Sequence, residues 1–119
     1  MDRHETTLAR LAIADDAYCD TLLAQETTNV AESQLDPKTH ALVRLGALIA
    51  IDSASPGYMS TLATARRRGA TDEEIVGCLI AVLPTIGVAR VVSAAPELAL
   101  ALGFDVTAAL ERSEAPPSA

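Results

Sequence analysis

One run of apolar residues, broken by a single charge, constrains the fold of this chain more than any other feature. Residues 42–51 are all apolar except Arg44. Asp36 and Pro37 stand before the run as an N-cap and a first helical residue, and they predict that a helix begins there. A helix that is apolar nearly all round must be buried on most sides. So short a chain would need neighbouring subunits, as well as its own core, to bury it.

The composition favours helices for the rest of the chain. Half of the 119 residues are hydrophobic, yet only 3% are aromatic and none is Trp. A core of Ala, Leu, Ile and Val suits closely packed helices, whereas sheets favour β-branched and aromatic residues. We therefore expect an all-α, single-domain helical bundle.

Periodicity and helix-terminating residues predict the other elements. Residues 5–25 have the spacing of an amphipathic helix, and the polar stretch 26–34 is typical of a loop, although part of it could be helical. Further helices are expected over 56–68, from 72 onwards, over 88–102 and around 104–110. Their limits are marked by residues that start, stop or kink helices: Pro56, Gly69, Thr71, Glu74, Pro84, Gly87 and Pro96. We expect one domain, with an N-terminal helix and loop (1–34), a helical core (35–113) and a flexible tail (114–119).

Charge and cysteine content exclude several classes of function. The net charge of −7 disfavours nucleic-acid binding, which depends on Lys and Arg. The basic run 66–68 is interpreted as a solvated helix end. Cys19 and Cys78 lack metal or redox spacing, so we expect reduced thiols, no metal and no cofactor. With neither a signal peptide nor a membrane-spanning stretch, the protein is predicted to be cytoplasmic and not to bind membranes.

A set of polar residues around the second and third expected helices forms the candidate site. His40 and Arg44 share one helix face. The candidate catalytic residues are His40 and Tyr58, and the candidate substrate-binding residues are Arg44, Ser53, Ser55, Ser60 and Thr61. Together they could hold a small organic anion. In the alternative interpretation, Arg44 pairs with an acidic group across a subunit contact and His40 lies near solvent.

Three segments, in this order and spacing, carry a resemblance to a known family. They are LDPKT at 35–39, ATARRRGATDEEI at 63–75 and LPTIG at 83–87. Over residues 35–95 the chain resembles the carboxymuconolactone decarboxylase family, which includes the alkylhydroperoxidase D-like antioxidant proteins. The resemblance implies an all-helical fold and a homo-oligomer, a trimer or hexamer.

The resemblance does not extend to the family's reactive side chains. Redox members carry a Cys-x-x-Cys-x-x-x-His motif between the second and third helices. Counted back from Gly69, the motif falls on Ala54, Gly57 and Thr61; counted forward from Asp36, it falls on Ser53, Pro56 and Ser60. Neither alignment supplies a thiol, nor the His that the decarboxylase branch keeps. The Glu that usually follows the Pro-Lys-Thr segment is Ala41 or Leu42 here.

Three functions follow from this pattern. The first is a non-redox lyase, decarboxylase-like or isomerase-like enzyme acting on a small organic acid, with His40 or Tyr58 as proton donor. The second is a non-catalytic oligomer that binds a small molecule or acts as a scaffold. The third, an antioxidant of the alkylhydroperoxidase or peroxiredoxin type, is disfavoured by the missing cysteines.

Overall fold

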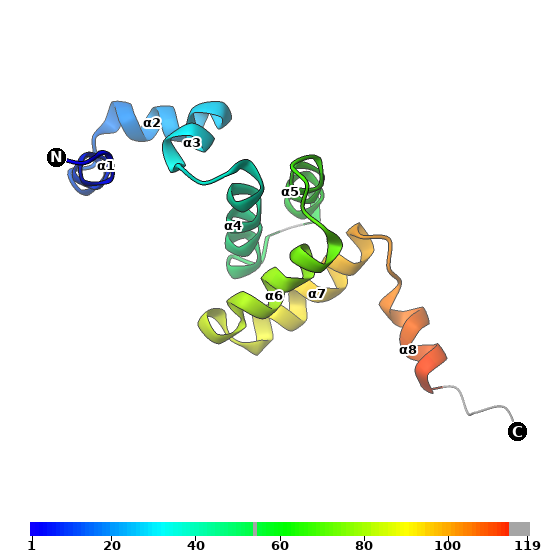
Figure 1. Ribbon diagram of the computed structural model, residues 1–119. Helices are drawn as coiled ribbons and strands as arrows, with labels where there is room; N and C mark the ends of the chain where they lie inside the picture. The colour runs from blue at the N-terminus through cyan, green and yellow to red at the C-terminus, as the bar shows by residue number, and fades with distance from the viewer. Residues whose placement is uncertain (54, 115–119) are drawn as a thin grey trace, which may run out of the picture. The chain divides into compact units, whose positions relative to one another are not determined.

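The computed structural model describes residues 1–53 and 55–114, and every regular element in those ranges is an α-helix (Figure 1). The expected all-α class is therefore confirmed. The chain divides into two compact units, Met1–His40 and Ala41–Ala119. None of the described helices is both long enough and apolar enough to cross a membrane.

The first unit contains α1 (Arg3–Ala12), α2 (Asp16–Ala24) and α3 (Glu26–Ser33), with α2 packed against both neighbours. The prediction of one helix over 5–25 is wrong because the chain turns sharply between α1 and α2. Ala14 has a positive φ of 54°, which no right-handed helix tolerates. Asp15 then caps α2, since its Oδ1 accepts a hydrogen bond from the Tyr18 backbone N–H at 3.1 Å.

The alternative that part of 26–34 is helical is confirmed, and α3 takes up most of a stretch that otherwise suggested a loop. This polar helix is held by side-chain hydrogen bonds to α2. Asn29 Nδ2 donates to the Leu22 carbonyl oxygen at 2.9 Å, and the Tyr18 hydroxyl donates to Glu32 Oε2 at 2.8 Å. Such tertiary bonds stabilise a helix that apolar periodicity alone does not indicate.

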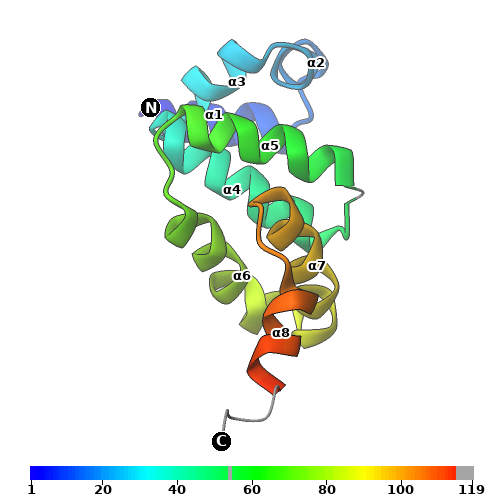
Figure 2. The ribbon, with the colours of Figure 1, turned by 90° about the vertical axis from the view of Figure 1, so that its right-hand side faces the viewer.

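The second unit contains most of α4 (Pro37–Ala50), which begins in the first unit, followed by α5 (Ser55–Arg67), α6 (Asp72–Ile86), α7 (Val88–Ala101) and α8 (Val106–Glu114). Helix α7 packs against α5, α6 and α8. Figure 2 shows α4 and α5 lying side by side, and the Tyr58 hydroxyl of α5 donates to the Leu48 carbonyl oxygen of α4 at 3.4 Å.

Several predicted helix limits are confirmed. Asp36 caps α4, accepting at Oδ1 from the Thr39 N–H at 3.0 Å. Gly69 (φ +92°) and Gly87 (φ +89°) follow α5 and α6 in the positive-φ region that glycine adopts without strain. Pro84 does not end α6, and α7 continues through Pro96. Of the predicted tail, Glu114 is the last residue of α8, and 115–119 lie outside the described residues.

The core of the second unit is aliphatic, with one aromatic ring. Its buried members are Ala41, Leu45, Ile49, Tyr58, Leu62, Ala65, Ala70, Ile75, Leu79, Ala94 and Leu98. The outer side of α4 is different: Val43 is 59% exposed, and Ile51, just past the helix end, is 69% exposed. The apolar segment is thus only partly covered by its own chain.

Candidate functional site

Tyr58 lies in the core, at the point where α5 crosses the end of α4. Its side chain is 1% exposed, and its hydroxyl donates to the Leu48 carbonyl oxygen. Burial raises the pKa of Tyr58, and the negative charges of Glu97 and Asp52 raise it further. The hydroxyl therefore stays protonated at neutral pH. It could give a proton but could not act as a base.

The predicted substrate-binding residues have different environments. Arg44, Ser53 and Thr61 are half-buried, whereas Ser60 is exposed. The Ser55 side chain lies outside the described residues. Asp52, which is adjacent to this group, accepts a hydrogen bond at Oδ1 from the Ser93 hydroxyl at 3.2 Å, so the α4–α5 connection is tied to α7. The structure thus places Ser53, which is half-buried, in the α4–α5 connection, and Tyr58, which is buried in the core, close after it in α5.

His40 belongs to the first unit and is 6% exposed. The interpretation that it lies near solvent is therefore wrong. Its Nε2 is 2.7 Å from Asn29 Oδ1. Because the Asn29 amide nitrogen donates to Leu22, its oxygen must be the acceptor, and the hydrogen-bond network assigns the shared proton to His40 Nε2. This bond orients the ring. A catalytic role for His40 stays a prediction.

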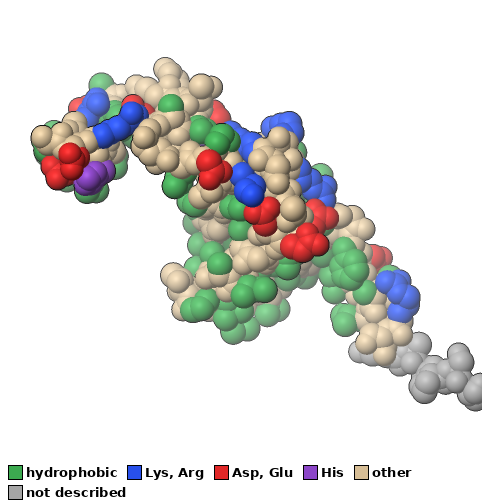
Figure 3. Space-filling model, in the orientation of Figure 1, with side chains coloured by type: hydrophobic (Ala, Val, Ile, Leu, Met, Phe, Trp, Pro, Cys, Tyr) green, Lys and Arg blue, Asp and Glu red, His purple; other side chains and the backbone are tan. Residues whose placement is uncertain are grey.

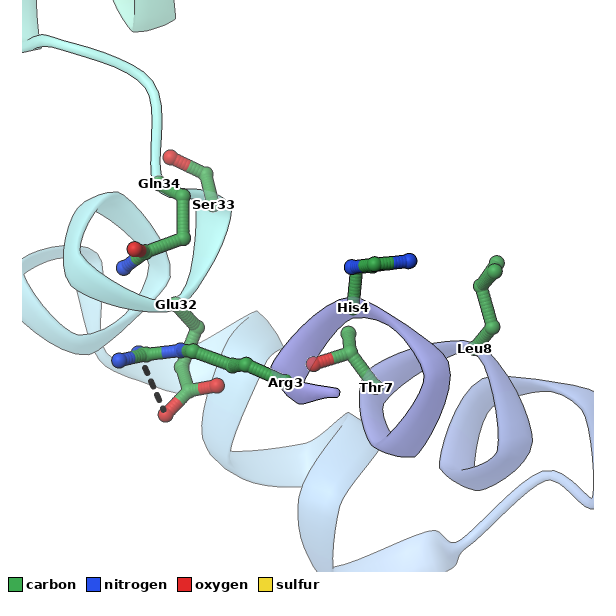
Figure 4. Close-up of a pocket in the computed structure, with 7 residues that line it drawn as sticks. All are labelled: Arg3, His4, Thr7, Leu8, Glu32, Ser33 and Gln34. Atoms are coloured by element: carbon green, nitrogen blue, oxygen red, sulfur yellow. Dashed lines mark ion pairs between the residues drawn. The ribbon is translucent and has the colours of Figure 1, made fainter. Parts of the chain in front are cut away.

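The first unit also contains a hollow that the sequence did not indicate. It has a volume of about 560 Å³ and lies between α1 and α3 (Figure 4), lined by Arg3, His4, Thr7, Leu8, Glu32, Ser33 and Gln34. Arg3 pairs with Glu32 at 3.9 Å, so its charge is already partly balanced. The two walls lie far apart in sequence and share no motif, so no local signal could have found them.

Acidic side chains near the hollow already cap the N-terminus of α1. Asp2, His4 and Glu5 could bring one ligand atom each within 4.8 Å of one another, but all three are exposed. Glu5 Oε2 accepts from the Asp2 backbone N–H at 3.3 Å, as expected of an acidic residue in a first helical turn. This cluster is therefore explained by capping and is not assigned as a metal site.

The family comparison covers most of both units. Residues 16–100 match the model described as the carboxymuconolactone decarboxylase family. The chain belongs to this family. The match begins in α2 and ends in α7, so it extends beyond the segments that carry the sequence resemblance. No curated protein and no solved structure matches the chain.

At position 57 of this chain, a family thiol would meet the side chain of Ser53. A Cβ added to Gly57 would lie 2.5 Å from Ser53 Oγ, well inside van der Waals contact. Any larger side chain there requires Ser53 to move. Ala54, the other thiol position in that alignment, lies outside the described residues. In this member of the family, the Ser53 side chain occupies the space next to the motif position.

We predict that Gly57→Ala changes the free energy of unfolding by less than about 1 kcal/mol. The Ser53 hydroxyl ends a short rotatable side chain and can turn away from the new Cβ, and Ala favours helix formation by about 1 kcal/mol relative to Gly. Chemical unfolding followed by circular dichroism measures the change. In a Ser53→Ala background the same substitution should cost no more, since the remaining Cβ–Cβ contact is an ordinary 3.7 Å. A loss above about 2 kcal/mol for Gly57→Ala that the Ser53→Ala background removes would contradict this explanation.

The chain's own cysteines are poor substitutes for the family thiols. Cys19 and Cys78 are both free and half-buried. The Cys78 thiol donates weakly to the carbonyl oxygens of Glu74 (3.5 Å) and Leu42 (3.8 Å). Burial raises the pKa of Cys78, and the charge of Glu74 raises it further. Because the thiolate is the nucleophile, a raised pKa makes Cys78 unreactive at neutral pH.

Proposed function

We propose that this chain is a non-redox member of the carboxymuconolactone decarboxylase family that binds a small organic acid through its second unit. The absence of a cysteine at the motif positions, which are Ala54 and Gly57 in one alignment and Ser53 and Pro56 in the other, carries the non-redox part of the proposal. Arg44 supports the part of the proposal that concerns an organic acid. It is half-buried and is the only charged residue in the apolar segment 42–51. A protein with a net charge of −7 needs such a local cation to attract an anion.

Between a binding protein and an enzyme, the position of Tyr58 supports the binding protein. A substrate could reach its hydroxyl only by opening the core around a side chain that is 1% exposed. The second candidate is a lyase- or isomerase-like enzyme that acts on a small organic acid, with Tyr58 or His40 as proton donor. The family description, which names a decarboxylase, supports that candidate.

The proposal includes assembly of the chain into a homo-oligomer, a trimer or hexamer, in the cytoplasm. The exposed Val43 and Ile51 at the outer side of the α4 segment support assembly, because large exposed apolar patches are uncommon on monomers. The half-buried free cysteines fit a reducing compartment.

We expect Arg44→Ala to weaken the binding of small carboxylates by roughly 2–5 kcal/mol, as for the loss of one partner of a desolvated charge pair. Isothermal titration calorimetry with a panel of dicarboxylates and unsaturated lactone acids measures the change. Release of carbon dioxide from the same panel distinguishes the enzyme from the binding protein.

Arg67→Ala is the matched control, because it removes the same charge from an exposed position in the last turn of α5. It should leave carboxylate affinity unchanged. If Arg44→Ala instead lowers thermal stability or breaks the oligomer while affinity is unchanged, Arg44 is a structural residue and the organic-acid proposal is wrong.

A further inference from the structure

The pair of helices α6 and α7 carries an apolar surface that the described residues leave uncovered. Figure 3 shows hydrophobic side chains gathered over these two helices. The hairpin face, as we name it, consists of Val76, Ile80, Leu83, Val88 and Val92, which are 37–72% exposed. Residues 76, 80 and 83 fall on one stripe of α6, and 88 and 92 fall on one stripe of α7.

We propose that the hairpin face binds the same face of a second copy of this chain. The proposal rests on the assembly included in the proposed function, and it identifies the surface that assembles. If a free aliphatic side chain carries about 100 Å² of apolar surface, these five side chains expose on the order of 300 Å². A standard interface buries about 800 Å² on each partner, a little over half of it apolar. The hairpin face therefore supplies most of the apolar contact that one interface needs.

The charge distribution favours a second copy as the partner. Each copy carries a net charge of −7, so two copies can approach closely only through a surface without negative charge. Residues 75–89 contain no charged side chain. Acidic residues 72–74 precede this stretch and Arg90 follows it, so an antiparallel pair of copies brings opposite charges together at both ends.

The same charges disfavour a lipid surface as the partner. A helix that lies on a membrane carries Lys and Arg beside its apolar stripe, and anionic lipids attract them. The residues at the start of α6 are instead Asp72, Glu73 and Glu74. They would repel an anionic headgroup from that end of the hairpin face.

The shape of the hairpin face also suits contact with the same face of a second copy. Beside the ridge of large side chains lies a hollow of about 390 Å³, lined by Asp72, Glu73, Val76, Gly77 and Ile80. A Cβ added to Gly77 would meet nothing within 4 Å, so no contact within the described part of the chain requires glycine there. Glycine inside a helix is unfavourable unless a neighbour approaches closely. A two-fold pair brings an aliphatic side chain of each copy over Gly77 of the other, where there is no side chain to displace. Such pairing builds even-numbered assemblies such as a hexamer.

The test is the mass of the full-length chain in solution, measured by light scattering over a range of concentrations. We expect the mass of the parent protein in solution to be a multiple of 12.4 kDa, the mass of one chain. Ile80→Glu should raise the dissociation constant by roughly tenfold or more, because each copy then places a carboxylate in the apolar contact. Gly77→Leu should weaken assembly in the same way by filling the hollow. Leu23→Glu is the control, since Leu23 is 85% exposed on α2 of the first unit, and it should leave the mass unchanged.

The outcomes separate this inference from the proposed function. A parent mass of 12.4 kDa at every concentration would overturn both assembly and this surface. An oligomer that persists in Ile80→Glu and Gly77→Leu, or that Leu23→Glu disrupts equally, would overturn the surface and leave assembly intact. Hydrogen exchange of the parent protein needs no variant. Amide protection over 75–92 that rises with concentration supports the hairpin face, and protection there that does not change overturns it.

Discussion

Tyr58→Ala should lower the free energy of unfolding by about 3–5 kcal/mol, the range for deleting a buried aromatic side chain. Tyr58 is the largest of the fully buried side chains in the described core. The other buried members of its core cluster are aliphatic, and they cannot expand to fill the space that the ring leaves. Because a domain of this size is stable by only about 5–15 kcal/mol, this variant should unfold at a much lower urea concentration.

Tyr58→Phe is the control, because it keeps the ring and removes the hydroxyl. We expect the free energy of unfolding to fall by less than about 1 kcal/mol, because the 3.4 Å hydrogen bond is long. The Leu48 carbonyl oxygen also still accepts a hydrogen bond from the Ser53 backbone N–H at 3.0 Å. A Tyr58→Phe loss as large as that of Tyr58→Ala would show that the hydroxyl, not the ring, sustains the core.

The stabilities of the parent protein and of Tyr58→Phe should depend differently on pH. The pKa of Tyr58 is raised in the folded state, so the folded protein keeps this proton to higher pH than the unfolded chain does. The resulting stabilisation is complete below the unfolded pKa of about 10 and is lost as the pH rises through the folded value. Tyr58→Phe lacks this contribution and should lose less stability than the parent above about pH 10.

Consumption of peroxide in the presence of a dithiol reductant should not depend on either cysteine. The parent protein and the Cys19→Ser, Cys78→Ser double variant should have the same rate, equal to that of the buffer. A peroxidase cycle needs a reactive thiolate and a resolving thiol within reach. Here neither aligned motif position carries a thiol, and the pKa of Cys78 is raised.

Alkylation of Cys78 supplies an independent measurement. The folded protein should react with iodoacetamide at neutral pH at least about tenfold more slowly at Cys78 than the urea-unfolded chain does, because burial restricts both access and ionisation. Peptide mass spectrometry follows the site. Peroxide turnover that the double variant loses would show that the non-redox proposal is wrong, even if Cys78 is alkylated slowly.

The elements that could be predicted from the sequence are those whose causes lie within one or two helical turns. Asp36 caps the helix that begins at Pro37, Thr71 and Glu74 form a capping box, and Gly69 and Gly87 adopt positive φ values. Each of these interactions joins residues a few positions apart, so local spacing is enough to predict it. The family, too, could be identified from short segments in order.

The features that required the tertiary structure depend on residues far apart in the chain or on a backbone turn without a local signal. Residues 26–33 are helical because their side chains bond to α2, and the turn at Ala14 separates two helices that have one continuous periodicity. His40 is buried against Asn29, eleven residues earlier.

The candidate site shows the same division. The absence of a family thiol and the single arginine that interrupts an apolar helix can both be seen in the residues alone. The enclosure of Tyr58 by the core and the position of the Ser53 side chain beside Gly57 appear only once the helices are packed. The reason is physical: residue type and helical spacing follow from the chain, but burial and close contact depend on which helices pack together and at what depth.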